Sequence, residues 1–202
     1  MADDLRPNVA VLEAKDHPPR EKRLTVAEFV RMGELGLLDE PGRHELWDGR
    51  IMMAPPAGSP HMDCERRILK ALILAIEAAG LGDKLGVFAS GGLQIGGNNL
   101  RSPDIMVAHL PFDTSKRLTG EGVALVIEVA HSSLPDDLTE KRGKYASAGV
   151  AEYWVVDVEN RLLYMFRDPK AGDYPECRPL AAGAKISPLF EPKLSFDVAA
   201  LV

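Results

Sequence analysis

The chain has 202 residues, enough for one domain with a buried core, and its 46% hydrophobic content is that of an ordinary globular protein. No apolar run approaches the roughly 18 residues that would cross a bilayer. A formal net charge of -6 argues against a protein that coats nucleic acid non-specifically, because such binding depends on neutralising phosphates, but it does not exclude a nuclease whose acids hold metal ions.

The N-terminal stretch and the two cysteines bear on domain organisation and compartment. Residues 1–24 mix charges with prolines and show no periodicity, so we expect a loose arm there and a single domain over 25–202. The start of the chain lacks the basic and apolar segments of a secretory signal. Cys64 and Cys177 stand far apart, without C-x-x-C spacing. These features predict a reduced protein of the cytoplasm.

A helix and a hairpin are predicted at the start of the domain. Thr25-x-x-Glu28 is a capping-box pattern, and apolar residues at helical spacing follow it, which predicts a helix over 25–35. Residues 44–53 predict a hairpin that turns at Asp48-Gly49, a dipeptide that suits the tightest hairpin turns.

The longest helix is predicted after a loop rich in proline and glycine. Ser59 is a candidate N-cap, Pro60 suits the first helical position, and Gly80 ends the helix. One apolar stripe lies along it, formed by Ile68, Leu72, Ala75, Ile76 and Ala79 and widened by Leu69 and Ile73. Its basic residues could contact phosphate or form a solvated face: Arg66, Arg67 and Lys70.

Short strands broken by glycines follow. They are predicted over 85–89, 92–95 and 103–107, with a turn at 96–99 that lacks any nucleotide-binding glycine pattern. Residues 123–129 are apolar except for Glu128, and such a run is typical of a strand in the centre of a sheet.

A helix and a second hairpin complete the predicted elements. Asp136 or Asp137 would cap a helix that extends to Ala148 and stops at Gly149. Residues 152–158 and 161–166 predict a hairpin through Glu159-Asn160, whose first strand, with Tyr153–Val156, is most simply part of the core. Beyond residue 168 the strand signals are weak.

Two acids stand in strands that are otherwise apolar, Asp104 and Glu128. Burying a charge is costly, and two acids in neighbouring strands would repel each other unless a cation lay between them. A divalent cation such as Mg²⁺ takes one or two protein carboxylates and fills its other positions with water and phosphate oxygens. The carbonyl of Val129 would lie near the same cation. The alternative, in which each acid pairs with an arginine, such as Asp104 with Arg101, or caps a loop, stays open.

A cationic side chain near the scissile phosphate would assist phosphodiester hydrolysis. On a strand, the residue two after Glu128 shares its face, but that residue is Ala130. The nearest candidates are Lys141 and Lys144, which are one turn apart on the following helix and could both face the sheet. Without the two acids, solvated helix lysines would be the simpler interpretation.

The order of these motifs resembles the Uma2 family of bacterial restriction-endonuclease-like proteins, also named DUF820, within the PD-(D/E)XK nuclease superfamily. Any single motif is weak, but the ordered set covers residues 25 to 195. The matching residues are His44-Glu45-Leu46, Asp48-Gly49, His61, Ser102-Pro103-Asp104, Glu128-Val129-Ala130, Ser132-Ser133-Leu134, Asp137, Lys141, Tyr145-Ala146, Gly149-Val150 and Glu152–Asp157.

The resemblance implies an α/β, restriction-endonuclease-like fold, with a central mixed sheet flanked by helices, and a metal-dependent endonuclease that hydrolyses DNA. It implies Mg²⁺ or Mn²⁺ held by Asp104, Glu128 and the Val129 carbonyl. It assigns the catalytic lysine to Lys141, which would orient water or neutralise the phosphate, rather than to Lys144. We also expect a homodimer, because nucleases that cut both strands often pair two active sites.

Three further residues keep open roles. Glu45 matches a recurrent acid of the family and is either an additional metal ligand or a strand-end acid bonded to nearby backbone. His61 either caps the long helix or faces the site, and His61-x-x-Cys64 lacks the second ligand pair of a zinc site. His131 stands where related sequences more often carry Asp or Ser, and we assign it no role.

The alternative function is a catalytically inactive module that keeps the nuclease fold and binds nucleic acid or protein as a homodimer. The net charge of -6 and the alanine at position 130 support this alternative.

Overall fold

The computed structural model describes residues 20–40 and 42–202. Its centre is a five-stranded sheet in the order β10-β9-β8-β6-β3. Strand β8 (Val123–Ala130) runs antiparallel to β6 (Ile105–His109) and parallel to β9 (Glu152–Asp157), and the edge strands are β3 (Leu85–Ala89) and β10 (Leu162–Arg167). Every residue of β8 is buried, which confirms the predicted central strand.

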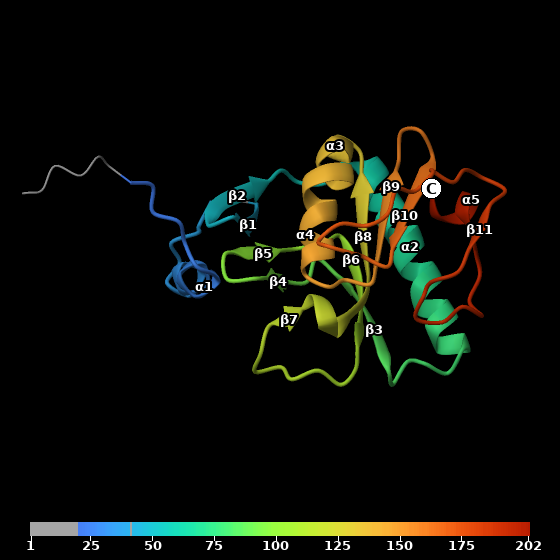
Figure 1. Ribbon diagram of the computed structural model, residues 1–202, viewed down its shortest axis with the longest axis horizontal. Coiled ribbons are helices and arrows are strands. Elements are labelled where there is room, and N and C mark those ends of the chain that lie inside the picture. The colour runs from blue at the N-terminus through green and yellow to red at the C-terminus, as the bar shows by residue number, and fades with distance from the viewer. Residues whose placement is uncertain (1–19, 41) are drawn as a thin grey trace, which may run out of the picture.

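Helices cover both faces of this sheet (Figure 1). On one face lies α2 (Ser59–Ala78), beside the short C-terminal helix α5 (Val198–Leu201). On the other face lie α3 (Leu134–Asp136), the π-helical turn η2 (Asp137–Lys141) and α4 (Arg142–Ser147), which follow one another directly in the chain. The predicted architecture, a central mixed sheet flanked by helices, is therefore confirmed.

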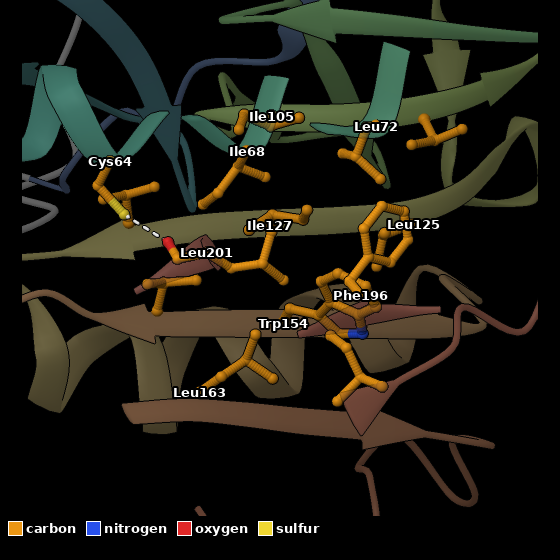
Figure 2. Close-up of a cluster of buried hydrophobic side chains, with 14 of the residues drawn as sticks. Cys64, Ile68, Leu72, Ile105, Leu125, Ile127, Trp154, Leu163, Phe196 and Leu201 are labelled. Atoms are coloured by element: carbon orange, nitrogen blue, oxygen red, sulfur yellow. Dashed lines mark hydrogen bonds between the residues drawn. The ribbon is translucent and has the colours of Figure 1, made fainter. Parts of the chain in front are cut away.

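Alternate residues of β8 belong to two apolar clusters, because successive side chains of a strand point to opposite faces. Leu125, Ile127 and Val129 pack in the cluster beneath α2, where Cys64, Ile68 and Leu72 meet them (Figure 2). Val126 and Ala130 pack in the other cluster, with Tyr145 of α4 and Tyr153 of β9. Tyr153–Val156 is fully buried, as predicted. Glu128 thus lies on the α4 face of the sheet.

A second sheet holds the predicted first hairpin, in the order β2-β1-β5-β4-β7. Its strands are β1 (Arg43–Trp47), β2 (Arg50–Ala54), β4 (Leu93–Ile95), β5 (Asn99–Arg101) and β7 (Leu118–Thr119). Asp48 and Gly49 have φ angles of 46° and 77°, so the turn between β1 and β2 is left-handed, as such hairpins require. The predicted first helix is α1 (Val26–Glu34), with the Thr25–Glu28 capping box formed.

Several predicted boundaries were wrong. The N-cap of α2 is Gly58 rather than Ser59, and Ser59 is the first helical residue. Proline is tolerated throughout the first turn, so Pro60 does not fix the start of the helix. Neither Asp136 nor Asp137 caps the helix after β8, because Ser133 holds that position and the Asp137 N–H already bonds the Ser133 carbonyl at 3.0 Å.

The apolar stripe of α2 is narrower than predicted. Its fully buried residues are Cys64, Ile68, Leu72 and Ile76, whereas Ile73 is 45% exposed. The basic residues Arg66 and Arg67 pair with Asp63 at 2.7 and 3.2 Å on the outside of the helix. Arg66 agrees with the solvated-face interpretation, whereas Arg67 is half-buried and also donates to the Val202 carbonyl at 2.8 Å.

The two ends of the described chain add small elements. Of the arm expected over 1–24, residues 1–19 lie outside the described residues, and Leu24 donates its N–H to the Gly49 carbonyl at 2.9 Å. Strands β11 (Lys185–Ile186) and β12 (Phe196–Asp197) form a separate two-stranded sheet. Throughout the described ranges, every helix is too short or too polar to cross a membrane.

Candidate active site

A cavity of about 610 Å³ opens at the end of the central sheet where β6 begins and β8 ends. Side chains from five parts of the chain line it, so the fold gathers residues that are far apart in the sequence. The polar and titratable lining residues include Arg43, Glu45, His61, Glu65, Asp104, Glu128, His131 and Lys141. The three predicted catalytic residues, Asp104, Glu128 and Lys141, thus lie in one cavity.

The register of β6 and β8 brings the two predicted metal ligands together. Ile105 pairs with Ile127, so one residue further along the same register Asp104 lies opposite Glu128. Residues opposite each other in an antiparallel pair share a face, with Cβ atoms about 5 Å apart. Strand β6 starts at Ile105, and the Asp104 carboxylate accepts the Val129 N–H at 2.8 Å. Asp104 therefore caps the end of β8 while its side chain stays in the cavity.

Asp104 has two basic neighbours in addition to that backbone contact. His61 Nε2, from the first turn of α2, lies 3.0 Å from Asp104 Oδ2, and Arg43 Nη1 lies 3.5 Å from Oδ1. Burial alone would raise the pKa of Asp104, but the hydrogen bonds from His61 and Val129 lower it. Asp104 is therefore an anion near neutral pH. The alternative in which Asp104 pairs with Arg101 is not observed, because Arg101 pairs with Glu140 at 3.0 Å.

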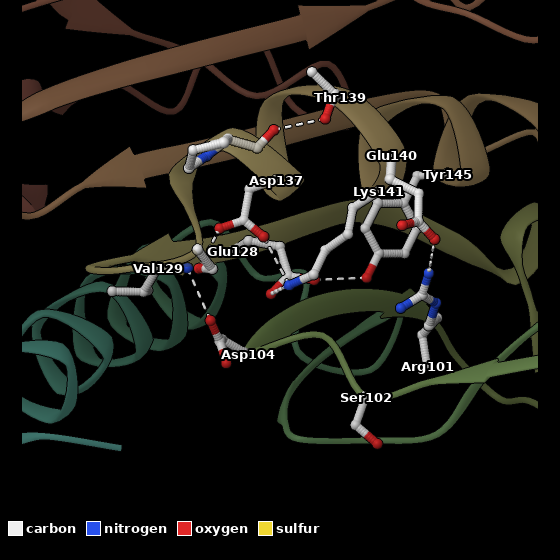
Figure 3. Close-up of polar contacts among 12 residues, drawn as sticks. Arg101, Ser102, Asp104, Glu128, Val129, Asp137, Thr139, Glu140, Lys141 and Tyr145 are labelled. Carbon is white, nitrogen blue, oxygen red and sulfur yellow. Dashed lines mark hydrogen bonds and ion pairs between the residues drawn. The ribbon is translucent and has the colours of Figure 1, made fainter. Parts of the chain in front are cut away.

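Glu128 is almost completely buried and has two partners. Tyr145 donates its hydroxyl to Oε1 at 2.6 Å, and the Lys141 ammonium lies 3.2 Å from Oε2 (Figure 3). Burial raises the pKa of Glu128 to about 8, with Lys141 opposing the shift and Asp104 reinforcing it. Glu128 is therefore mostly protonated at neutral pH, and it ionises above about pH 8 or when a cation replaces its proton.

The two candidate lysines have different surroundings. Burial alone would lower the pKa of Lys141, but Glu128 and Asp137 raise it, so the ammonium stays charged. Lys144, one turn later, points instead to the turn of the first hairpin and donates to Asp48 Oδ1. Lys144 is not a lining residue of the cavity. Ala130 is buried on the face of Glu128, so no cation comes from that position.

Glu45 lines the cavity, but its carboxylate is already engaged. Oε1 accepts the Ser102 N–H at 3.1 Å and Oε2 accepts Trp47 Nε1 at 2.7 Å. Arg43 Nε approaches Oε1 at 3.5 Å. The Ser102 contact agrees with the considered alternative of an acid bonded to nearby backbone, although Glu45 lies in the middle of β1 rather than at its end.

The remaining candidates are also placed. His61 faces the cavity and Asp104, while His131 lines the cavity and is exposed. Cys64 is fully buried, its Sγ donates to the Leu201 carbonyl at 3.2 Å, and burial raises its pKa to about 11. Such a thiol is a poor nucleophile or metal ligand.

Arg43, Asp137 and Tyr145 also contact the site, and we did not assign them from the sequence. Asp137 and Tyr145 belong to the family resemblance, so their recurrence was a usable signal. Arg43 had no signal, because a charged residue at the start of a hairpin strand is ordinary.

The donor set suits a hard divalent cation. Among the described residues, no group of three or more His, Cys, Asp or Glu side chains is arranged as a metal site. Mg²⁺ nevertheless binds commonly through one or two carboxylates and keeps several waters, which is what Asp104 and Glu128 can offer. Zinc fits poorly, because no cysteine lines the cavity and only His61 and His131 provide nitrogen.

Comparisons with known proteins identify a family and a fold. A family model described as "Uma2: Putative restriction endonuclease" matches residues 26–199. A search of curated proteins found no match. The structure resembles a protein of Anabaena variabilis described as a "putative nuclease belonging to DUF820", with a TM-score of 0.65 and 16% sequence identity, over 88% of this chain and 97% of that one. This likeness confirms the predicted fold.

A second solved structure is less similar. The type IIG restriction endonuclease BpuSI matches 61% of this chain and 14% of its own, with a TM-score of 0.39 and 16% identity.

Proposed function

Because the chain belongs to the Uma2 family, described as restriction endonucleases, we propose that it is a metal-dependent endonuclease that hydrolyses DNA phosphodiester bonds. The observation that carries the proposal is the convergence of Asp104, Glu128 and Lys141 in one cavity at the end of the central sheet. Two acids and a charged lysine in this arrangement suit hydrolysis of an anionic ester.

In this proposal, Asp104, Glu128 and the Val129 carbonyl hold Mg²⁺ or Mn²⁺. The bound cation would supply an activated water and neutralise charge on the phosphate. Asp104 offers Oδ1, whose one close contact among the described residues is Arg43 at 3.5 Å, while the contacts to Oδ2 fix the carboxylate orientation. Burial and the charge of Glu128 raise the pKa of Tyr145, so its hydroxyl stays protonated and donates to Glu128.

Lys141 is the proposed cationic residue of the reaction. Its ammonium has three donors and faces Glu128 and Asp137 with two of them, so the third can bind the attacking water or a phosphate oxygen. Arg43 lines the same cavity and is the second positive charge that an incoming phosphate would meet. We propose that Glu45 supports the site rather than binds the metal, because it accepts the Ser102 N–H and so holds the segment that leads to Asp104.

The proposal is tested by metal binding and by plasmid nicking. Calorimetry should show uptake of Mg²⁺ or Mn²⁺ at millimolar concentrations, and Asp104→Asn should weaken this binding at least about tenfold because a ligand charge is lost. Nicking of supercoiled plasmid should require the metal and stop with chelator. Glu159→Gln, at an exposed acid of the β9–β10 turn, is the matched control and should bind metal normally. A protein that takes up neither metal is not this enzyme.

Metal affinity should rise with pH, because coordination needs the ionised form of Glu128. With a pKa of about 8 for Glu128, protons compete with the metal below that value and cease to compete above it. Affinity should fall by up to about tenfold for each pH unit below 8. Calorimetry at pH 6.5 and 8.5, in buffers of different ionisation enthalpy, would reveal the proton released on binding.

His61 contributes to this pH dependence in the same direction. Its hydrogen bond to Asp104 raises its pKa, and the protonated ring would repel a cation at that carboxylate. The variant His61→Gln separates the two groups, since the dependence that remains belongs to Glu128. Metal affinity that is equal at both pH values would contradict the assignment of Glu128 as a ligand.

We also propose that the protein acts as a homodimer, so that two sites can cut both DNA strands. The second candidate function is an inactive module that keeps the fold. The net charge of -6 and Ala130 favour it. DNA binding without metal uptake or nicking would support this candidate over the enzyme.

A further inference from the structure

Asp137 is a buried acid that the proposed reaction does not use. It is 0% exposed, on the π-helical turn η2, and the Lys141 ammonium lies 2.7 Å from its Oδ1. The same ammonium reaches Glu128 at 3.2 Å, so Figure 3 shows one lysine between two carboxylates. Acid–lysine pairs four residues apart on a helix are usually solvent-exposed. Here both side chains are largely withdrawn from water, and Asp137 lies behind Lys141, which lines the cavity.

Asp137 is itself fixed from two directions. Ser133 donates its hydroxyl to Asp137 Oδ2 at 2.6 Å, and Tyr153 donates its hydroxyl to the Asp137 carbonyl at 3.0 Å. Tyr153 is fully buried and packs on Tyr145 and Phe166. Contacts with Ser133 and Tyr153 therefore fix both the carboxylate and the backbone of Asp137, independently of Lys141.

We propose that Asp137 is a positioning residue that holds the Lys141 ammonium in the cavity, an inference that rests on the proposed function of Lys141. A lysine has four rotatable side-chain bonds, and fixing them costs conformational entropy that a single weak contact does not offset. When the Glu128 oxygens are engaged by a cation, their hold on the ammonium weakens. Asp137 then keeps Lys141 beside the reacting groups.

A purely structural role for Asp137 makes a different prediction. Acids near a helix N-terminus stabilise the helix through its dipole, and such a role would change stability without changing the surroundings of Lys141. The decisive measurement is therefore the chemical accessibility of the Lys141 amine.

The experiment is reductive methylation of the intact protein, with the rate at each lysine followed by peptide mass spectrometry. In Asp137→Asn, methylation of Lys141 relative to Lys144 should be faster by about tenfold, because one of the two ion pairs of the ammonium is lost. The difference should grow when Mg²⁺ is present. Glu140→Gln is the matched control, because Glu140 lies on the same turn but pairs with Arg101 at 3.0 Å. In this variant the rate of Lys141 methylation should stay within about twofold of wild type.

Nicking supplies the second readout. In Asp137→Asn, kcat should fall about tenfold while KM for DNA and the metal Kd stay within about twofold, because only the lysine is misplaced. If Asp137→Asn is methylated and nicks plasmid at the wild-type rates, the positioning role of Asp137 is overturned, but the proposed endonuclease function is not affected. If the wild-type protein does not nick plasmid, the proposed endonuclease function is rejected. The methylation rates of Lys141 would still test whether Asp137 positions that lysine. If Asp137→Asn fails to fold, Ser133→Ala should raise the Lys141 rate about threefold, and an unchanged rate overturns the inference.

Discussion

Replacing Lys141 with methionine should lower the rate of plasmid nicking by about a hundredfold to a thousandfold, the usual loss when one group that stabilises transition-state charge is removed. Methionine retains the approximate length and apolar stem of lysine but carries no charge. The Lys141 ammonium lies 3.2 Å from Glu128 Oε2, where it competes with a metal for that carboxylate. Metal affinity should therefore be retained or increased, while catalysis is lost. This combination distinguishes a catalytic lysine from one that only maintains the metal site.

Lys144→Met is the matched control, because Lys144 lies one turn later on the same helical segment. It contacts Asp48 in the turn of the first hairpin and does not line the cavity. Its nicking rate should stay within about threefold of wild type, with a small loss of stability from the broken surface ion pair. Equal losses in the two variants, or wild-type nicking by Lys141→Met, would contradict the assignment of Lys141.

The choice between these lysines shows where sequence reasoning stops. Helical periodicity places both near the sheet, because they are one turn apart. Their surroundings differ through contacts that are distant in the sequence: Lys141 pairs with Glu128 in β8, whereas Lys144 pairs with Asp48 in the turn of the first hairpin. Only the family resemblance favoured Lys141 before the structure was known.

Local patterns predicted most of the central fold. The apolar run around Glu128, the Asp48-Gly49 turn and the Thr25–Glu28 capping box each act over a few residues, and all are observed. The two-residue strands β11 and β12 were missed, because two residues are too few to show alternation. Helix α5, of four residues, was missed because it is too short to show helical periodicity.

The electrostatic surroundings of the site could not be predicted. His61 and Asp104 are 43 residues apart, and Arg43 and Asp104 are 61 apart, so no spacing rule joins them. The sequence predicted a metal ion between Asp104 and Glu128, and the structure adds His61 and Arg43 beside Asp104. These contacts explain how a carboxylate can remain ionised at the buried end of a sheet.

Removing the guanidinium of Arg167 should cost the protein about 3 kcal/mol of unfolding free energy, at the lower end of the range for breaking a buried ion pair. Glu152, opposite Arg167 in the β9–β10 ladder, is 0% exposed. Arg167 Nε donates to Glu152 Oε1 at 2.7 Å, so Arg167→Met leaves a buried carboxylate without its counter-ion. Trp154 Nε1 at 2.8 Å and the Leu189 N–H at 2.6 Å still donate to Glu152, which limits the loss.

Chemical denaturation of three variants would test this expectation. Arg66→Met breaks an ion pair of similar geometry, 2.7 Å to Asp63, but both side chains are more than half exposed, so its loss should stay below about 0.5 kcal/mol. Adding Glu152→Gln to Arg167→Met should recover part of the stability, because the amide removes the unpaired charge and still accepts hydrogen bonds. An Arg167→Met variant as stable as Arg66→Met would contradict the argument. Such a result would mean that the stability of β9, which neighbours the strand that carries Glu128, does not depend on the ion pair between Arg167 and Glu152.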